Sequence, residues 1–146
     1  MRILISRWFL LVLMIATGLG VCSLRGAGQS TASDDYAALA EAPAKASLRR
    51  NPREGDTQDR AAGKKLFLQH CAECHGSDAN GGSRAPSLRA DEVRLATAGT
   101  LFWILTNGVV RRGMPVWSKL PEPQRWQIVT YIRTLENTPV SIKNAR

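Results

Sequence analysis

The sequence of 146 residues predicts a small all-α domain that follows an N-terminal extension. Two apolar stripes with helical spacing, and the absence of a β-branched run that would indicate a strand, favour helices. Leu101, Ile104 and Leu105 fall at positions i, i+3 and i+4, the spacing of one helix face. A second stripe near the C-terminus has the spacing i, i+3, i+4, i+7 and comprises Ile128, Tyr131, Ile132 and Leu135. No β-branched run precedes Cys71, where residues 63–70 also have a helical pattern.

Residues 1–22 resemble an export signal. Arg2 and Arg7 give a positive start, and the uncharged, mainly apolar run 8–21 has 14 residues. That run is shorter than the roughly 20 residues of a membrane span. Cleavage, retention as an anchor and lipidation at Cys22 all stay open. The sequence before Cys22 resembles a bacterial lipobox, although Val21 stands where a small residue is usual.

Residues 23–55 are expected to form a flexible, disordered linker. The segment is rich in Ala, Ser, Asp, Arg and Gly and lacks a sustained apolar period. Such a composition buries too little surface to order a chain. A transient helix over residues 37–46 is interrupted by Pro43.

The folded domain is predicted over residues 56–137. Asp56 is suited to capping the first helix, and Asp59 lies near the positive end of the helix dipole. Gly63 would cost helix stability unless it lets another helix approach closely. The helix then carries Phe67 towards a pair of cysteines.

The rest of the domain has a loop over residues 77–83 and a weak short helix over 91–96. Thr97 can cap the next helix, which Gly108 ends. An irregular segment precedes the last helix, which starts near Glu122. Beyond it, residues 138–146 read as a tail.

Cys71, Cys74 and His75 form the Cys-x-x-Cys-His pattern of c-type haem attachment. Residues i and i+3 share one helix face, so both thiols can form thioethers with one porphyrin while His75 faces its iron. A dithiol redox centre is the first alternative, but it usually follows a strand. A zinc site is the second, but its only other candidate ligand is His70, with no distant second pair. One covalently bound haem c is therefore expected.

Met114 is the candidate for the second axial ligand of the iron. His70 lies on the same helix as the attachment site, and Met1 and Met14 lie in the export segment. The alternative role for Met114 is to fill a gap in the core. Its irregular setting between Gly113 and a proline argues against that role. The expected metal ligands are thus His75 and Met114.

From Asp56 to Leu135 the chain resembles the class I, mono-haem bacterial c-type cytochromes. The resemblance implies a small cytochrome c fold, in which N- and C-terminal helices cross beside the covalently bound haem. It implies that Gly63 lies near the aromatic Tyr131 of the last helix. It further implies that the Pro86 carbonyl accepts a hydrogen bond from the ring of the proximal histidine. Pro121 departs from the family, which often has a Ser or Asp cap there.

The function expected from these residues is one-electron transfer between periplasmic or membrane redox partners. Such partners are dehydrogenases, cytochrome complexes or terminal oxidases. The chain would be an electron carrier rather than an enzyme, or a cytochrome subunit of a larger oxidoreductase. The alternative is a haem peroxidase or gas-binding protein with a labile sixth ligand. No distal His or Arg–His pair supports peroxide chemistry.

The net charge of +8 does not point to nucleic acid, because the basic residues are scattered and no nucleic-acid motif is present. Arg111, Arg112 and Lys119 instead suggest a basic rim that attracts acidic protein partners, or an ordinary solvated surface. The export segment places the protein in the periplasm or on the periplasmic face of the inner membrane, with the N-terminus as a membrane tether.

Overall fold

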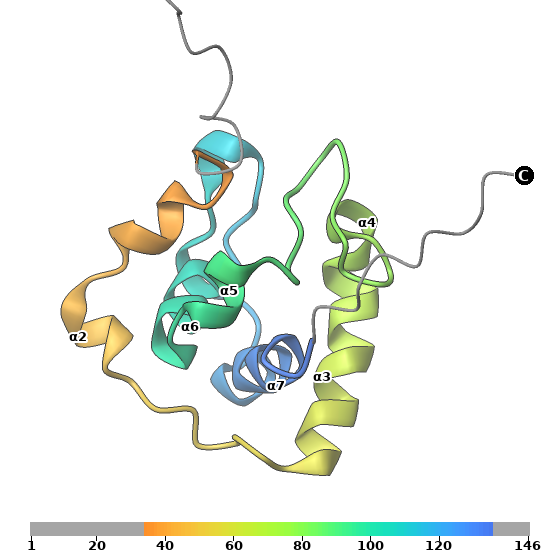
Figure 1. Ribbon diagram of the computed structural model, residues 1–146. Coiled ribbons are helices and arrows are strands. Elements are labelled where there is room, and N and C mark those ends of the chain that lie inside the picture. The colour runs from red at the N-terminus through yellow and green to blue at the C-terminus, as the bar shows by residue number, and fades with distance from the viewer. Residues whose placement is uncertain (1–33, 136–146) are drawn as a thin grey trace, which may run out of the picture.

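Helices α3 (Thr57–His70) and α7 (Glu122–Ile132) pack across one another and form the centre of the fold (Figure 1). The computed structural model describes residues 34–135. Around the crossing lie short helices and loops. In chain order these are the 3-10 helix η1 (Ala37–Glu41), then α2 (Ala44–Ser47), α4 (Ala72–His75), α5 (Asp91–Leu95), α6 (Ala98–Asn107) and the 3-10 helix η2 (Val110–Arg112). Over residues 34–135 the only β pairing is the isolated bridge between Val109 and Met114, so the all-α prediction is confirmed.

The α3–α7 contact depends on the absence of a side chain at Gly63. A Cβ atom there would overlap the backbone carbonyl of Gln127 and lie 3.1 Å from the Cβ of Tyr131. One turn further along α3, the Phe67 ring is fully buried and its centroid lies 5.3 Å from that of Tyr131. The prediction that Gly63 admits a second helix beside Tyr131 is confirmed.

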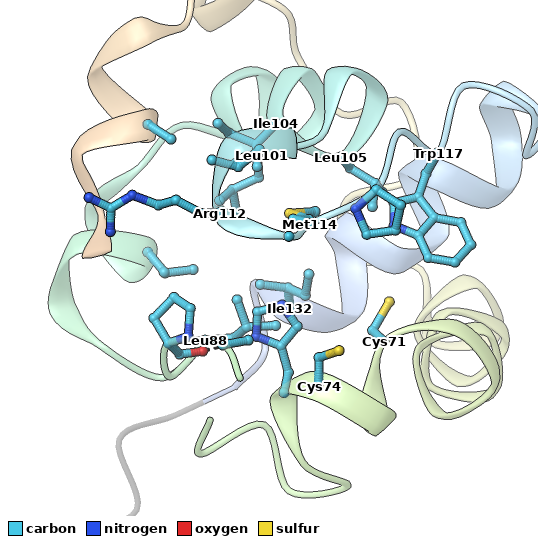
Figure 2. A pocket seen from close by; sticks show the side chains of 18 of the residues that line it. Cys71, Cys74, Leu88, Leu101, Ile104, Leu105, Arg112, Met114, Trp117 and Ile132 are labelled. Carbon is cyan, nitrogen blue, oxygen red and sulfur yellow. Dashed lines mark hydrogen bonds between the residues drawn. The ribbon is translucent and has the colours of Figure 1, made fainter. Parts of the chain in front are cut away.

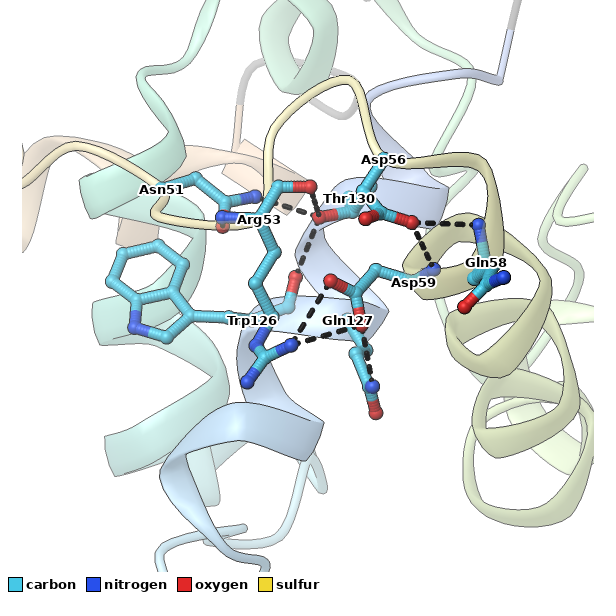
Figure 3. Close-up of polar contacts among 8 residues, drawn as sticks. All are labelled: Asn51, Arg53, Asp56, Gln58, Asp59, Trp126, Gln127 and Thr130. Atoms are coloured by element: carbon cyan, nitrogen blue, oxygen red, sulfur yellow. Dashed lines mark hydrogen bonds and ion pairs between the residues drawn. The ribbon is translucent and has the colours of Figure 1, made fainter.

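The first turn of α3 is capped and tied to α7 by polar side chains (Figure 3). The Asp56 carboxylate accepts hydrogen bonds from the backbone N–H groups of Gln58, at 2.7 Å, and Asp59, at 3.0 Å. The Asp59 carboxylate in turn accepts from the guanidinium of Arg53 at 3.0 Å and from the amide of Gln127 at 2.7 Å. The cap thus continues across the helix crossing.

A buried pair completes this polar network. Asn51 donates from its amide nitrogen to the Thr130 hydroxyl at 2.8 Å, and both residues are under 10% exposed. The hydroxyl lies 3.0 Å from the carbonyl oxygen of Trp126, within α7 (Figure 3). A buried polar group needs such a partner, so these contacts fix the chain before α3 against α7.

A second core lies between α6 and α7. Thr97 caps α6, as predicted, by accepting from the Thr100 N–H at 3.1 Å. Phe102 and Trp126 stack with ring centroids 3.9 Å apart. The other buried members of this core are Val93, Leu101, Leu105, Ile128 and Val129. Helix α7 ends at Ile132, earlier than its apolar stripe predicted, and Leu135 is buried from the turn that follows.

The predicted flexible linker over residues 23–55 is wrong for residues 34–55. Helices η1 and α2 lie along α6 and lead to the start of α3 (Figure 1). At Gly99 a Cβ atom would overlap the carbonyl of Ala46, so the two backbones touch. These contacts use backbone groups, single polar groups and isolated apolar side chains rather than an apolar stripe, which is why composition did not reveal them.

The predicted export segment 1–22, the linker residues 23–33 and the tail 138–146 lie outside the described residues. None of the helices between residues 34 and 135 combines the length and the apolar character needed to cross a membrane.

Candidate cofactor-binding site

A largely apolar cavity of about 340 Å³ lies between the end of α3, α4, α6 and the segment after α6. All five predicted site residues border it, namely Cys71, Cys74, His75, Pro86 and Met114. Figure 2 shows the two cysteines on one side of the cavity and Met114 on the opposite side, beneath Leu101 and Leu105 of α6. The fold therefore brings together residues that are up to 43 positions apart in the sequence.

Cys71 and Cys74 lie where α3 passes into α4. The Cys71 N–H donates to the Phe67 carbonyl at 2.8 Å, and the Cys74 N–H donates to the Cys71 carbonyl at 3.2 Å. The helical turn thus continues through the motif and both thiols, which are free, face the cavity (Figure 2). Burial, with a smaller contribution from Cys74, raises the pKa of Cys71 to about 11.

His75 is oriented by the loop that follows it. Its Nδ1 lies 2.9 Å from the carbonyl oxygen of Pro86, which can only accept, so Nδ1 carries the proton. Burial lowers the pKa of His75, and the hydrogen bond to Pro86 opposes this only in part. The ring is therefore neutral near pH 7, and Nε2 holds a lone pair suited to a metal.

The loop over residues 76–88 is folded back tightly to bring Pro86 to His75. Gly81 has φ +75° and donates its N–H to the His75 carbonyl at 2.8 Å. A Cβ at Gly81 would lie 2.5 Å from the Ser87 nitrogen, so only glycine fits this approach. The Leu88 N–H closes the loop on the Ala79 carbonyl at 2.9 Å.

Met114 is held against the end of α6. Gly108, with φ +68°, ends the helix, and a Cβ there would lie 2.7 Å from the Met114 carbonyl oxygen. Val109 and Met114 exchange backbone hydrogen bonds at 3.0 and 3.2 Å. The Trp117 N–H then donates to the Leu105 carbonyl at 3.2 Å. The backbone thus fixes the half-buried Met114 over the cavity.

Sequence reasoning missed the contribution of the N-terminal segment to this site. Asp35, Tyr36, Ala38 and Leu39 all border the cavity. The one available signal was Tyr36, the single aromatic residue within 23–55. An aromatic side chain carries a large apolar area, so it is unusual in a free linker.

The other residues considered from the sequence, His70, Arg84 and Arg112, make ring contacts or exposed ion pairs. His70 is half-buried on α3, and its ring centroid lies 5.3 Å from that of Trp117. Arg84 is ion-paired with Glu73 at 3.1 Å, and Arg112 with Asp35 at the same distance.

These groups suit a flat, apolar, iron-containing cofactor. Two sulfurs one helical turn apart can anchor its edge, a neutral imidazole and a thioether are iron ligands, and the remaining wall is mainly aliphatic. The residues present therefore fit a haem.

Comparison with known proteins gives a family and a fold. The family model "Cytochrome C oxidase, cbb3-type, subunit III" matches residues 58–132, just over half of the chain. A curated relative, the "Cbb3-type cytochrome c oxidase subunit CcoP" of Rubrivivax gelatinosus, is 28% identical over 125 residues. The match covers 82% of this chain but only 41% of that relative.

The fold is similar to that of a solved cytochrome. The crystal structure of cytochrome CL from the marine methylotrophic bacterium Methylophaga aminisulfidivorans MPT superposes with a TM-score of 0.53 at 22% identity. The superposition covers 78% of this chain and 72% of cytochrome CL. At that identity the likeness describes the fold.

Proposed function

Because the chain belongs to the cytochrome c family described as cytochrome c oxidase, cbb3-type, subunit III, whose members carry out haem-based electron transfer, we propose that it carries single electrons on one covalently bound haem c. Cys71 and Cys74 would form the thioethers, and His75 and Met114 would be the axial ligands. The observation that carries this proposal is the position of Met114 across the cavity from the cysteine–histidine turn (Figure 2).

When bound, the haem supplies an Fe(II)/Fe(III) couple. The chain's own residues would orient the haem's ligands and tune its reduction potential. Pro86 holds His75 with Nε2 free, and Leu101, Ile104 and Leu105 of α6 give the cavity an apolar wall. A thioether is a soft, neutral donor that favours Fe(II), so Met114 would raise the reduction potential. If His75 and Met114 both bind the iron, no site would be open to a substrate, and we assign an electron carrier rather than an enzyme.

For the partner we propose a terminal oxidase, with the cytochrome exported and held at the periplasmic side of the inner membrane. Support comes from the CcoP relative, whose name describes a subunit of a cbb3-type oxidase. This chain spans 41% of the length of that relative. Co-purification from membranes tests the proposal: oxidase subunits support it, whereas a dehydrogenase or another cytochrome complex contradicts it.

The dithiol alternative is disfavoured by the thiol chemistry. Reactive dithiol centres depend on a cysteine whose pKa is lowered, which keeps the nucleophilic thiolate available. Burial does the opposite at Cys71, raising its pKa to about 11. A purified protein that gives no pyridine haemochrome spectrum after acid–acetone extraction would contradict covalent haem attachment. It would favour a dithiol redox centre at Cys71 and Cys74 instead.

The ligand assignment is tested by Met114→Ala. We expect the ferric variant to lose the red-region charge-transfer band of sulfur-ligated haem, and the reduced variant to bind carbon monoxide rapidly. Ile104→Val, which trims an aliphatic lining residue, is the matched control and should keep the band. A band that survives in Met114→Ala would show that Met114 is not the ligand. Rapid carbon monoxide binding by the unmodified protein would favour a gas-binding function.

A further inference from the structure

We propose that Asp35 and Tyr36 are positioning residues that hold the Met114 segment closed over the cofactor and so limit how readily Met114 leaves the iron. They lie in the strap, which we define as residues 35–39. The strap precedes residues 58–132, the region that the family model matches. The inference rests on the proposed His75/Met114 coordination.

The first anchor of the strap is the Tyr36 hydroxyl. It donates to the backbone carbonyl of Ser87 at 2.9 Å, across 51 positions of sequence. Ser87 directly follows Pro86, whose own carbonyl receives the His75 Nδ1–H. Burial raises the pKa of Tyr36, with smaller contributions from Glu92 and Asp35, so the hydroxyl stays protonated and remains a donor. One end of the strap is thus fixed to the loop that orients His75.

The second anchor is the Asp35 carboxylate. It pairs with the Arg112 guanidinium at 3.1 Å, across 77 positions of sequence. Arg112 ends η2, the single turn enclosed between the bridged residues Val109 and Met114. The ion pair at Arg112 therefore restrains the short loop that carries Met114. Tyr36, the next residue of the strap, is hydrogen-bonded to the loop on the other side of the cavity, at Ser87.

Beyond these two adjacent anchors, the rest of the strap borders the cavity. Ala38 and Leu39 line it, and Tyr36 and Leu39 pack against the α6–α7 core. Figure 2 shows Arg112 at the side of the cavity away from the cysteines. On the cysteine side the thioethers would fix the cofactor covalently. On the Arg112 side the two ligand segments are joined through the strap.

Opening of the Met114 segment can be measured by ligand entry, because an added ligand must displace Met114 first. We would mix the ferric full-length holoprotein with imidazole and follow the loss of the charge-transfer band. The variants are Tyr36→Phe, Asp35→Asn and the two combined. The control is Asp34→Asn, which removes the adjacent exposed carboxylate. The exchange of charges in Asp35→Arg with Arg112→Asp tests for rescue of the pair.

We expect imidazole to enter about fivefold faster in Tyr36→Phe, from the loss of one hydrogen bond, and about twofold faster in Asp35→Asn, since exposed ion pairs are weaker. The control should match the unmodified protein, and the charge exchange should restore its rate. Before imidazole is added, all variants should keep the band, because the strap positions Met114 and does not replace it.

The outcomes separate this inference from the proposed function. Unchanged entry rates with an intact band and a lowered urea midpoint would show a purely structural strap and overturn the inference alone. A protein without covalent haem, or without the band before any substitution, overturns the proposed coordination and the inference together. If the combined variant does not fold, the two single variants decide, because each removes only one polar interaction.

Discussion

The two sides of the cavity are built in different ways. The side with Cys71, Cys74 and His75 comes from one continuous turn at the end of α3, and the α3–α7 crossing supports it. The Met114 side is assembled from the end of α6, the bridge at Val109 and the strap of residues 35–39. The first side depends on one helix contact and on the loop that orients His75, and the second on several weak contacts between distant segments.

This difference predicts how each side fails. Damage to the α3–α7 crossing should destabilise the whole domain, because the cysteine turn directly follows α3. Damage to the Met114 side should loosen Met114, the proposed ligand, while most of the fold persists. Local stability of this kind varies within proteins, and segments with few buried contacts open first.

The largest effect should come from Gly63→Ala. The added Cβ would overlap the Gln127 carbonyl, which is backbone and cannot rotate away. We expect a loss of about 3 kcal/mol in the free energy of unfolding, although alanine favours helices by about 1 kcal/mol over glycine. Urea unfolding followed by far-UV circular dichroism measures it.

The control for Gly63→Ala is Gly82→Ala, since a Cβ at Gly82 has no atom within 4 Å. We expect its free energy of unfolding to change by less than about 1 kcal/mol. Equal effects at the two positions would mean that the crossing does not depend on the close approach at Gly63.

A smaller effect, confined to the Met114 side, should come from Gly108→Ala. Gly108 and Gly113 both have positive φ, so alanine strains the backbone at either position by about 1 kcal/mol. Only at Gly108 would the Cβ also meet the backbone of Met114 and Pro115. We expect about 2 kcal/mol of destabilisation at Gly108 and about 1 at Gly113. The Gly108 variant alone should also show a weakened charge-transfer band.

The comparison between these two glycines isolates the contact from the strain. Urea unfolding gives the stability, and ferric spectra report on Met114. If both variants lost the same stability and kept the same band, the end of α6 would have no role in holding Met114.

The smallest effect should be a change in acid stability from Asp59→Asn at the crossing. The hydrogen bond from Gln127, assisted by Arg53, lowers the pKa of Asp59 below its ordinary value of 3.8. A depressed carboxylate contributes stability that is complete above the ordinary pKa and is lost as pH falls through the native value. The variant should therefore lose less stability than the unmodified protein when pH falls from 5 to 3.

Urea midpoints measured across that pH range provide the test. Glu54→Gln, which removes an exposed carboxylate in the preceding turn, is the control and should follow the unmodified curve. An identical pH dependence in Asp59→Asn would sink the idea that the link between α3 and α7 is charge-assisted.

Much of the helical framework could be predicted from local sequence. Asp56 and Thr97 cap helices where expected, Gly108 ends α6, and α7 begins at Glu122. Each of these signals acts within a few residues, so composition and spacing were sufficient. The shorter α7 was not foreseen, because an apolar stripe at helical spacing is satisfied equally well by a buried Leu135 in the turn beyond the helix.

The candidate site likewise has parts that the sequence could predict and parts that needed the structure. The Cys-x-x-Cys-His turn could be identified from sequence, because five adjacent residues place its groups on one helical face. Met114 could be named by elimination, and its position across the cavity needed the structure. The strap was predicted as a linker and is folded, because its contacts to Ser87 and Arg112 span 51 and 77 positions.

By itself, then, the sequence determined the main helices α3, α6 and α7, the cysteine–histidine turn and Met114 as the one candidate methionine within residues 34–135. Tertiary structure alone decided how that methionine is held and what covers the cavity beside it. The physical reason is the separation in sequence between the residues that interact. Capping, periodicity and a five-residue motif are short-range effects, whereas a single tyrosine hydroxyl and one exposed ion pair carry no pattern until folding brings their partners together.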